Sequence, residues 1–409
     1  MSATAAPAPW LSLVGVGEDG ASGLSAKASE QVGGAELVVG GRRHLDLVSA
    51  LVRGDALPWR SPIEATMPEI LARRGRPVCV LATGDPFHYG VGSLLMRHIP
   101  VAEMRCWPQP SAFSLVAGRL GWSLEDCRCV SVHGRALARV IPAFQDGRRL
   151  ITLSWDETTP SLLADLLVAR GFGATRIWVC EAMGGAGERV RETSAAHFGL
   201  SGIQPLNTVA CEIRAGAGAR QLPATPGLPD GWFAHDGQIT KAVIRAATLA
   251  ALAPRPGERL WDIGAGSGSV GIEWLLAEAS AHVVAVERNG ARAARVSANA
   301  EHWGVAERLD VVTGAAPAAL AGLPSPDAAF IGGGLTEPGL LEAVQATLAA
   351  GGRLVVNAVT LESQALLSHR LGRDGGDLLT LSIARAEPVG GFHGFRPAMP
   401  VVQWRWVKP

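Results

Sequence analysis

The chain has 409 residues, of which 48% are hydrophobic and 18% are charged. Because domains of about 100–200 residues are usual and disordered chains are less apolar, these values predict two or three folded domains and exclude a disordered chain. Lys plus Arg and Asp plus Glu number 37 each, so no excess positive charge is available to neutralise a nucleic-acid backbone, and nucleic-acid binding is disfavoured.

The six cysteines contain no C-x-x-C pair, which favours free thiols in a reducing compartment over a zinc site or a disulfide framework. The stretch before Glu18 has no basic region and contains Pro7 and Pro9, unlike a signal peptide. No apolar run reaches the ~18 residues that span a bilayer. These features predict a cytoplasmic protein with neither a membrane nor a metal partner.

The first half of the chain, from Trp10 to about Val209, alternates short β-rich runs with helical runs, which is typical of an α/β fold. Strands are predicted at residues 11–16, 37–39, 78–82, 101–106, 130–132, 150–153 and 176–180. Helices lie between them, for example at 111–120 and 160–170.

Residues 214–229 then lose all periodicity and concentrate Ala, Gly and Pro. This composition predicts a linker between a domain at 1–213 and a domain at 230–409.

The second half also alternates the two kinds of run. Helices are predicted at 240–252, 270–279, 291–303 and 338–348, and strands at 259–263, 282–286, 309–312, 328–331 and 353–358. This order predicts a doubly wound parallel sheet. Two further β-rich runs at 378–385 and 400–407 are joined by a Gly/Pro loop, so we expect an antiparallel hairpin at the edge of the sheet.

The predicted strand at 259–263 leads into a helix through the glycine-rich sequence DIGAGSGS, residues 262–269. Glycines allow the backbone to approach a ligand, and a helix N-terminus presents N–H groups to a carboxylate or phosphate. Glu287 ends the next strand, 25 positions after Asp262, where a carboxylate can accept both hydroxyls of a ribose. This pair predicts a cofactor that contains adenosine.

Two cofactor classes fit this sequence. Residues 266–271 satisfy G-x-G-x-x-G, the fingerprint of dinucleotide binding, but that fingerprint normally begins as the strand ends. The longer form D-x-G-x-G-x-G resembles motif I of the Rossmann-like methyltransferases that bind S-adenosylmethionine, and we favour this class. A glycine turn that only packs the helix on the strand is the remaining interpretation.

The N-terminal half carries two glycine motifs after predicted strands. Residues 15–20 match G-x-G-x-x-G, but no acid follows the second strand, because Val39 precedes Gly40 and Gly41; as a dinucleotide fingerprint the match is weak. After the strand at 78–82, the sequence TGDPFHYG at 83–90 predicts a tight turn with one carboxylate at the carboxyl edge of the sheet. Open α/β sheets bind ligands at that edge.

These motifs resemble known families over about residues 10–409. The N-terminal half resembles the tetrapyrrole methylases of cobalamin biosynthesis through the loop with Gly15 and Gly17 and the segments GLS at 23–25, VGGRRH at 39–44, GDP at 84–86, YG at 89–90 and PSA at 110–112. The C-terminal half resembles the Rossmann-type methylase that partners them, through TK at 240–241, the loop at 262–269, IE at 272–273 and Glu287. The fusion in this order resembles the bifunctional, decarboxylating precorrin methyltransferases.

The resemblance implies a fold and a reaction. The fold is a tetrapyrrole methylase fold with two α/β subdomains, followed by a Rossmann-like methyltransferase fold with an antiparallel edge hairpin. The reaction transfers methyl groups from S-adenosyl-L-methionine to carbons 5 and 15 of precorrin-6B and removes carbon dioxide from the acetate chain on carbon 12, giving precorrin-8. Carbon 5 is assigned to the N-terminal domain, and carbon 15 with decarboxylation to the C-terminal domain. Two cofactor sites and a homo-oligomer, a tetramer built through the C-terminal domain, are also implied.

The resemblance further implies two sets of cofactor-contacting residues. In the C-terminal domain they are Thr240, Gly264, Ala265, Gly266, Ser267, Gly268, Glu287 at the ribose and Ala315 near the adenine. In the N-terminal domain they are Gly17, Gly84, Asp85, Phe87, Ser111 and Ala112. Methyl transfer from an activated sulfonium depends mainly on positioning, so no catalytic side chain is predicted.

An acidic tetrapyrrole requires cationic partners. The candidates are Arg42, Arg43, His44, Arg119 and Arg396, together with His88 and His393 in glycine-flanked loops. For each of them, a solvent-exposed side chain or a structural ion pair is the alternative. The candidates for lining a flat macrocycle pocket are Trp107, Trp122 and Trp303, with burial in the core as their alternative.

Three alternative functions remain open from the sequence. The first is a methyltransferase that acts on the cobalt-containing precorrin. The second is an enzyme similar to the tRNA adenine methyltransferases, which the C-terminal half also resembles, although the neutral net charge offers no basic groove. The third is a non-enzymatic protein that binds S-adenosylmethionine or a dinucleotide through the same fold.

Overall fold

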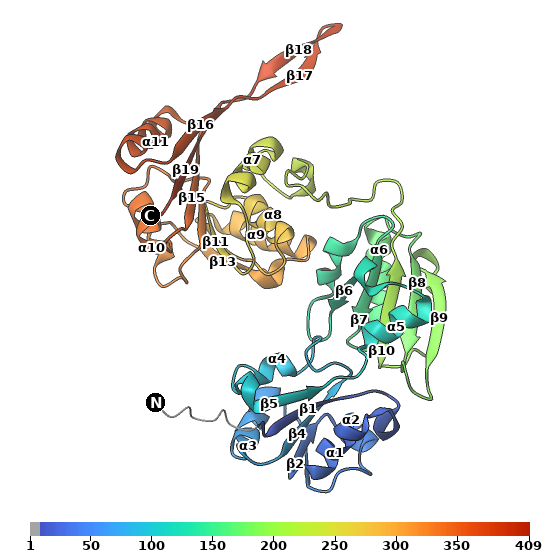
Figure 1. The fold of residues 1–409 in the computed structure, drawn as a ribbon. Coiled ribbons are helices and arrows are strands. Elements are labelled where there is room, and N and C mark those ends of the chain that lie inside the picture. The colour runs from blue at the N-terminus through green and yellow to red at the C-terminus, as the bar shows by residue number, and fades with distance from the viewer. Residues whose placement is uncertain (1–8) are drawn as a thin grey trace, which may run out of the picture. The chain divides into compact units, whose positions relative to one another are not determined.

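The computed structural model describes residues 9–409, so Pro7 and the rest of residues 1–8, on which part of the signal-peptide prediction falls, lie outside the described residues. The chain divides into two compact units (Figure 1). The first unit holds the residues up to 137 together with 143–221, and the second unit holds 138–142 together with 222–409. Within residues 9–409, every helix is too short or too polar to cross a membrane.

The first unit begins with a parallel sheet in the order β3-β2-β4-β1-β5. Its strands are β1 (Leu11–Val16), β2 (Leu37–Gly40), β3 (Asp55–Pro58), β4 (Val78–Thr83) and β5 (Met104–Trp107). Its helices are α1 (Ala26–Gly34), α2 (Arg42–Leu47), α3 (Met67–Leu71) and α4 (Gly92–Leu95). Every residue of β1 is buried, because two apolar clusters pack on this sheet. A ligand therefore has access at the carboxyl edge of the sheet and not at a face.

The rest of the first unit is a mixed sheet in the order β6-β7-β10-β8-β9. Its strands are β6 (Cys127–Ser131), β7 (Arg149–Leu153), β8 (Arg176–Glu181), β9 (Arg189–Ser194) and β10 (Asn207–Glu212), and its helices are α5 (Ala112–Leu120) and α6 (Thr159–Ala169). The pair β6 and β7 is parallel, and the other neighbours are antiparallel. The hydroxyl of Ser111 caps α5 by accepting a hydrogen bond from the Ser114 N–H at 3.2 Å. The helix ends at Gly121, whose φ of +64° is left-handed.

The second unit is built on a seven-stranded sheet in the order β13-β12-β11-β14-β15-β19-β16. Its strands are β11 (Arg259–Ile263), β12 (His282–Glu287), β13 (Leu309–Thr313), β14 (Ala328–Ile331), β15 (Arg353–Ala358), β16 (Asp377–Leu381) and β19 (Val401–Val407). Its helices are α7 (Ala242–Leu252), α8 (Ser269–Ala277), α9 (Gly290–His302), α10 (Leu340–Thr347) and α11 (Leu361–Asp374). The first five strands in this order are parallel, and β19 is antiparallel to both of its neighbours. The strand order reverses between β11 and β14, which is where open α/β sheets bind ligands.

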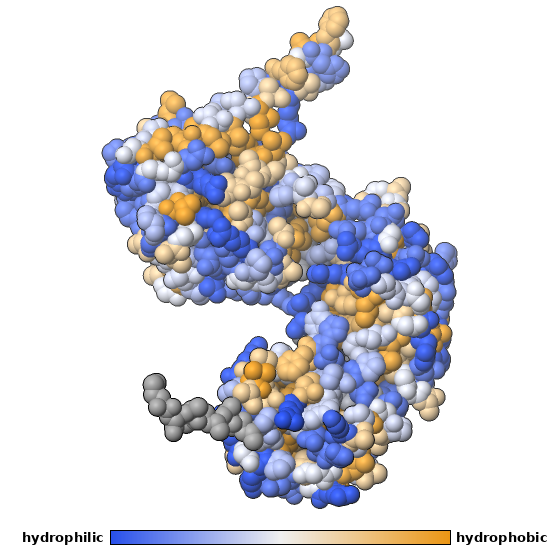
Figure 2. All heavy atoms as spheres, in the orientation of Figure 1, coloured by the Kyte–Doolittle hydropathy of each residue, from blue (hydrophilic) through white to orange (hydrophobic). Residues whose placement is uncertain are grey.

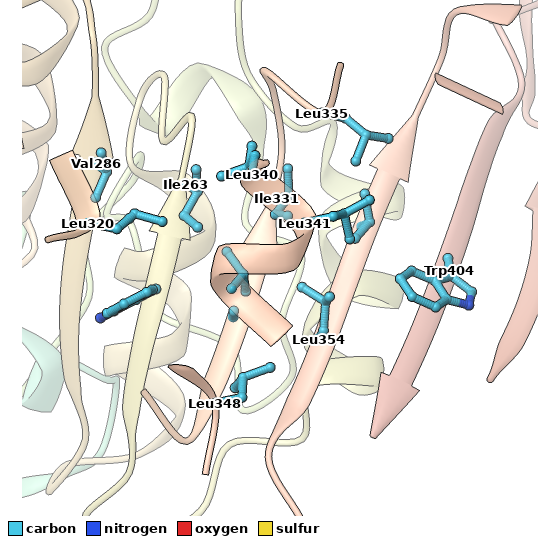
Figure 3. Close-up of a cluster of buried hydrophobic side chains, with 14 of the residues drawn as sticks. Ile263, Val286, Leu320, Ile331, Leu335, Leu340, Leu341, Leu348, Leu354 and Trp404 are labelled. Atoms are coloured by element: carbon cyan, nitrogen blue, oxygen red, sulfur yellow. The ribbon is translucent and has the colours of Figure 1, made fainter. Parts of the chain in front are cut away.

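A buried apolar cluster lies between this sheet and α10. Figure 3 shows Ile331 and Leu341 among the side chains that fill the layer between the strands and the helix in front of them. Trp404 of β19 belongs to the same cluster, and its indole N–H donates a hydrogen bond to the Gly375 carbonyl oxygen at 3.0 Å. Burial of one such side chain contributes about 1.5–3 kcal/mol, so the antiparallel strand is anchored in the core and not merely attached to the edge.

Between β16 and β19 the chain forms a two-stranded antiparallel ribbon of β17 (Ala384–Val389) and β18 (Phe392–Pro397). Figure 1 shows the ribbon, in red, projecting from the body of the second unit. Figure 2 shows hydrophobic residues gathered on the second unit where the ribbon leaves it. At the base of the ribbon, the Ala398 N–H donates a hydrogen bond to the Ile383 carbonyl oxygen at 2.8 Å, so the pairing of the ribbon strands continues toward β16 and β19.

The predicted fold class is confirmed, because two α/β sheets are followed by a Rossmann-like sheet with antiparallel strands at one end. Two predicted elements are wrong in part. The strand expected at 101–106 begins at Met104, because Val101–Glu103 forms a 3-10 helix after Pro100. The hairpin expected from 378–385 and 400–407 corresponds to β16 and β19, but β19 lies inside the sheet and the connecting loop contains β17 and β18. Besides β17 and β18, the sequence patterns missed β3, β9, β10 and α11.

Candidate functional site

A cavity of about 640 Å³ opens at the carboxyl edge of the sheet in the second unit. Its walls include residues 263–266 at the end of β11, 286–288 at the end of β12, 314–316 after β13 and 332–334 after β14. Residues 237–241 before α7 and the base of the ribbon also line it. Small-molecule sites have volumes of roughly 300–1,000 Å³. The cavity therefore has the size and the position of a cofactor site.

The glycine loop between β11 and α8 contributes only Gly264, Ala265 and Gly266 to this wall. Gly264 and Gly266 have φ angles of +71° and +60°, a region that glycine adopts without strain. A Cβ atom on Gly264 would lie 2.9 Å from the backbone nitrogen of Gly333, so no side chain fits between the two loops. The Gly264 N–H donates a hydrogen bond to the Val286 carbonyl oxygen at 2.9 Å. The backbone of the loop is thereby held against β12 at the edge of the cavity.

Glu287 ends β12 and lies in the cavity wall. Only 5% of its surface is exposed, and its carboxylate accepts hydrogen bonds from the N–H groups of Gly266 and Asn289, each at 2.9 Å. Because the two carboxylate oxygens together accept about four hydrogen bonds, Glu287 retains acceptor capacity for a ligand hydroxyl. It both holds the glycine loop and offers an acceptor to the cavity.

Asp262 begins the glycine motif but is not part of the cavity wall. Its side chain is buried and accepts a hydrogen bond from the Gly271 N–H of α8 at 3.0 Å. Burial raises the pKa of Asp262 to about 7, and the nearby charge of Glu287 adds to this rise. Its other carboxylate oxygen has no hydrogen-bond partner among the described residues. Asp262 therefore ties the loop to the helix.

The other predicted residues of this domain divide into two groups. Those that line the cavity are Thr240, Ala265 and Ala315. Ser267 and Gly268 lie outside its wall. Ser267 is buried, and its carbonyl oxygen accepts a hydrogen bond from the Asn299 side-chain amide at 2.9 Å. Gly268 packs so closely on α9 that a Cβ atom there would lie 2.7 Å from a side chain of that helix.

A buried ion pair that the sequence patterns did not reveal holds the segment from Gly227 to Thr240. Arg245 of α7 and Glu273 of α8 are 0% and 3% exposed, and the guanidinium Nε donates a hydrogen bond to the carboxylate at 2.5 Å. Glu273 also accepts hydrogen bonds from the N–H groups of Gly227 and Leu228, at 2.6 and 3.0 Å. Arg245 donates to the carbonyl oxygens of Leu228 and Thr240. The pair therefore fixes both ends of the segment that leads into the cavity wall.

Another part of the cavity wall comes from the end of β15 and the base of the ribbon. Its apolar members are Val359, Leu381, Ile383, Met399 and Val401. Its polar members are Asn357 and Arg385. The Asn357 amide donates to the Thr248 hydroxyl at 2.9 Å, and its carbonyl oxygen accepts from Gln403 at 2.9 Å. The sequence patterns singled out none of these residues, nor the glycines at 332–334, although three glycines directly after an apolar strand are the same signal as the loop at 264–268.

In the first unit, three of the predicted cofactor residues line a cavity of about 40 Å³ where β1 and β4 end: Gly17, Gly84 and Ala112. A Cβ atom on Gly84 would lie 2.8 Å from the Pro110 carbonyl oxygen, so the backbones are closely packed here. Asp85, Phe87 and Ser111 lie outside the wall of this cavity. The Asp85 carboxylate accepts a hydrogen bond from the Phe87 N–H at 2.8 Å. At roughly 10–15 Å³ for each water, the cavity has room for a few water molecules.

The predicted substrate cations of the first unit differ in their surroundings. Arg42 is exposed at the start of α2, whereas Arg43 and Arg119 form ion pairs with carboxylates of the same unit. His44 Nε2 lies 2.7 Å from the Thr83 hydroxyl oxygen. Burial, with the charge of Arg43, lowers the pKa of His44 to about 4, so its imidazole is neutral at pH 7. Of these four side chains, only Arg42 presents its charge to solvent without an ion pair among the described residues.

The remaining candidates lie apart from both cavities. His88 is exposed, with its ring centroid 4.7 Å from that of Phe113. His393 and Arg396 lie on β18, and Arg396 donates a hydrogen bond to Glu387 at 3.0 Å. None of the three belongs to the wall of the 640 Å³ or the 40 Å³ cavity.

The three tryptophans considered for a macrocycle pocket pack in apolar clusters. Trp303 is 1% exposed, with its ring centroid 5.7 Å from that of Trp232. Trp122 packs edge-on against Trp178 at 5.3 Å, and Trp107 packs against the buried cluster of β1 and β4. The walls of the two cavities contain none of the three, which agrees with the core alternative.

Comparison with known proteins identifies a family for each half of the chain. Residues 11–198 match the family model of tetrapyrrole (corrin/porphyrin) methylases. Residues 231–408 match the model of the precorrin methyltransferase domain. The chain is 54% identical to the Sinorhizobium sp. protein named precorrin-6Y C(5,15)-methyltransferase (decarboxylating). The alignment spans 400 residues, which are 98% of this chain and 97% of that protein.

Two shorter relatives come from Salmonella typhimurium. Its cobalt-precorrin-7 C(5)-methyltransferase is 30% identical over 180 residues, which are 44% of this chain and 88% of that protein. Its cobalt-precorrin-6B C(15)-methyltransferase (decarboxylating) is 34% identical over 167 residues, which are 40% of this chain and 85% of that protein. Among solved structures, the C-terminal domain of precorrin-6Y C5,15-methyltransferase from Rhodobacter capsulatus is 48% identical to this chain. The match includes 46% of this chain and 100% of the solved chain, with a TM-score of 0.44.

Proposed function

The chain belongs to the family of decarboxylating precorrin-6Y C(5,15)-methyltransferases of cobalamin biosynthesis, and from this membership we propose the complete reaction that it catalyses. It transfers methyl groups from S-adenosylmethionine to carbons 5 and 15 of precorrin-6B, and it removes carbon dioxide from the acetate chain on carbon 12, giving precorrin-8. The observation that carries the proposal is the contact of Glu287 with the glycine loop in a 640 Å³ cavity at the edge of the sheet.

The cavity of the second unit fits S-adenosylmethionine by its chemistry. Glu287 has acceptor capacity for the hydroxyls of a ribose, and the loop at 264–266 lets the cofactor approach the backbone. The small side chain of Ala315 leaves space for an adenine, and Thr240 lies in the same wall. When bound, S-adenosylmethionine supplies a methyl group on an already activated sulfonium.

The task of the chain's own residues is to bind and orient. Correct orientation alone contributes roughly 7–11 kcal/mol to lowering a barrier. Glu287 and the glycine loop define the cofactor end of the cavity. Asn357, which Thr248 and Gln403 hold in place, lies in the wall with the apolar side chains of Leu381, Ile383, Met399 and Val401. That part of the cavity provides an apolar surface on which a flat ring can lie beside the cofactor.

We assign carbon 15 and decarboxylation to a domain at 230–409, carbon 5 to a domain at 1–213, and a linker role to 214–229. The two family models, which match residues 11–198 and 231–408, support this assignment. Salmonella typhimurium also has separate proteins named for carbon 5 and for carbon 15 with decarboxylation, and each matches less than half of this chain.

We place a second S-adenosylmethionine site in the first unit, at Gly17, Gly84, Asp85, Phe87, Ser111 and Ala112. The open carboxyl edge of the parallel sheet and the match to the tetrapyrrole methylases support this site. A cavity of about 40 Å³ does not fit the cofactor as it stands, so its walls must move apart on binding.

The exposed Phe392 and Phe395 of the ribbon support the further proposal that the protein is a homo-oligomer formed through its C-terminal domain.

The test uses the full chain, precorrin-6B and S-adenosylmethionine labelled with carbon-13 in its methyl group. Nuclear magnetic resonance of the wild-type product is expected to show label at carbons 5 and 15 and a methyl group in place of the acetate on carbon 12. Glu287→Ala is expected to retain label at carbon 5 and to lose both reactions at the C-terminal site, whereas Glu301→Ala, an exposed carboxylate of α9, retains all three. Loss of carbon 5 label in Glu287→Ala would contradict the division, and no label in the wild type would contradict the function.

A further inference from the structure

We propose that Arg385 binds a carboxylate of the tetrapyrrole substrate in the cavity of the second unit. The inference rests on the proposed function, because it takes an acidic tetrapyrrole as the ligand. Arg385 is the second residue of β17, at the base of the ribbon, and it lies in the cavity wall. It was not among the arginines that the sequence motifs singled out.

The first support is the pairing of the cations in the cavity wall. Three of the four lie near carboxylates of the protein: Lys241 is 3.9 Å from Asp230, Arg288 is 3.7 Å from Glu337 and Arg292 is 2.9 Å from Asp236. The side chain of Arg385, by contrast, has neither an ion pair nor a hydrogen bond within residues 9–409. Its guanidinium therefore has five N–H donors available to a ligand.

The second support is the apolar surface around Arg385. Ile383, Val359 and Met399 lie in the same wall, and the last two are 47% and 73% exposed. Exposed apolar side chains that line a cavity indicate a ligand with an apolar surface of its own. A guanidinium recognises a carboxylate through two parallel hydrogen bonds. A flat macrocycle with carboxylates around its edge satisfies both parts of this wall.

The third support is the place of Arg385 relative to the cofactor end of the cavity. Glu287 lies at the end of β12, and the chain reaches Arg385 directly after β16. Four strands lie between β12 and β16 in the sheet order, so the two strands are five spacings apart. At about 4.8 Å for each spacing this is about 24 Å. A carboxylate at Arg385 is therefore bound beside the cofactor and does not compete with it.

Arg396 provides a direct comparison, because it is the residue opposite Arg385 in the ribbon and the sequence motifs did single it out. Both arginines are exposed, but Arg396 lies outside the cavity wall and donates a hydrogen bond to Glu387 at 3.0 Å. The two arginines share one short ribbon, but only Arg385 faces the cavity without a protein partner among the described residues.

The test compares Arg385→Met, Arg385→Lys and Arg396→Met in the full-length protein, with Arg405→Met as the matched control. Arg405 is an exposed arginine of β19 outside the cavity wall. Release of carbon dioxide from precorrin-6B gives kcat and KM for the second unit, and calorimetry with S-adenosylhomocysteine gives the cofactor affinity. We expect Arg385→Met to raise KM about tenfold or more while the cofactor affinity is unchanged. Arg385→Lys recovers part of this loss, because the charge remains without the planar fork.

An unchanged KM in Arg385→Met overturns the inference. An increase in KM that occurs in Arg396→Met and not in Arg385→Met also overturns it, as does an increase in Arg405→Met equal to that in Arg385→Met. A parallel loss of cofactor affinity in Arg385→Met also overturns it, because the residue would then act on the whole cavity. A wild-type protein that releases no carbon dioxide contradicts the proposed function and removes the ligand that the inference names. An active wild type with an unaffected Arg385→Met contradicts the inference alone.

Discussion

The carboxylate of Glu287 accepts a hydrogen bond from the Gly266 N–H at 2.9 Å. This contact joins two features that lie 21 residues apart in the sequence, the glycine loop after β11 and the acid at the end of β12. A glycine loop alone is compatible with simple packing of a helix on a strand. With Glu287 attached to it at the open edge of the sheet, the loop becomes part of a surface that offers both bare backbone and a hydrogen-bond acceptor.

Replacing Glu287 by Gln is expected to weaken binding of S-adenosylhomocysteine at the C-terminal site about 10- to 100-fold, because hydrogen bonds to a charged group contribute about 1.5–3 kcal/mol. Calorimetry on the full chain measures the affinity, and Glu301→Gln on α9 provides the exposed control. Equal affinities for Glu287→Gln and the wild type would contradict the role of this carboxylate.

The pKa of Asp262 gives a pH dependence with a defined sign. Burial raises this pKa from its usual 3.8 to about 7, so between these values the folded state retains a proton that the unfolded state has released. The stabilisation is therefore complete below about pH 4 and is lost as the pH rises toward 7. Relative to Asp262→Asn, the free energy of unfolding of the wild type is expected to fall over this range, by at most about 4 kcal/mol at 1.36 kcal/mol per pKa unit. Urea unfolding of both proteins at several pH values measures these free energies. If the free energy of unfolding of the wild type rose with pH relative to that of Asp262→Asn, Asp262 would not be a buried neutral carboxyl.

Breaking the buried pair of Arg245 and Glu273 is expected to be costly. Glu273→Gln leaves the guanidinium without its main counter-charge, which lowers the free energy of unfolding by about 3–5 kcal/mol. Glu337→Gln makes the same chemical change in an exposed pair with Arg288, where a loss below about 1 kcal/mol is expected. Urea unfolding compares the two variants. Equal losses would show that burial of the pair at Glu273 has no special effect.

The core beneath α10 provides a prediction of stability. Leu341 is 1% exposed within the apolar cluster, whereas Leu361, at the start of α11, is 79% exposed. Leu341→Ala is expected to lower the free energy of unfolding by about 2–5 kcal/mol, because a cavity remains. Leu361→Ala is expected to change it by less than about 0.5 kcal/mol. Thermal or urea unfolding of both variants checks this, and a comparable loss for Leu361→Ala would mean that α11 is covered in solution.

The sequence predicts best where a motif is local. The run from Arg259 through the glycine loop to Glu287 is a strand, a turn, a helix and a strand in direct succession, and the elements lie close to where the pattern puts them. The strand β9 was missed because its sequence RVRETS is polar at an exposed sheet edge, where charged residues are usual. The helix α11 was missed although Thr360 precedes it as an N-cap residue.

Features made by residues far apart in the chain were beyond the sequence patterns. Arg245 and Glu273 lie on different helices, and neither residue type predicts full burial. Arg385 reaches the cavity because β19 returns antiparallel beside β15 and brings the base of the ribbon with it. Arg396, by contrast, is the last residue of the sequence GFHGFR at 391–396 and lies outside the cavity wall.

The central claim is that this single chain carries out both methyl transfers and the decarboxylation. Mass spectrometry of the product formed by the full chain from precorrin-6B and S-adenosylmethionine tests it most directly. We predict a product that has gained two methyl groups and lost one carbon dioxide. A product that carries both methyl groups but keeps all of its carboxylates, or one that has gained a single methyl group, would contradict the claim.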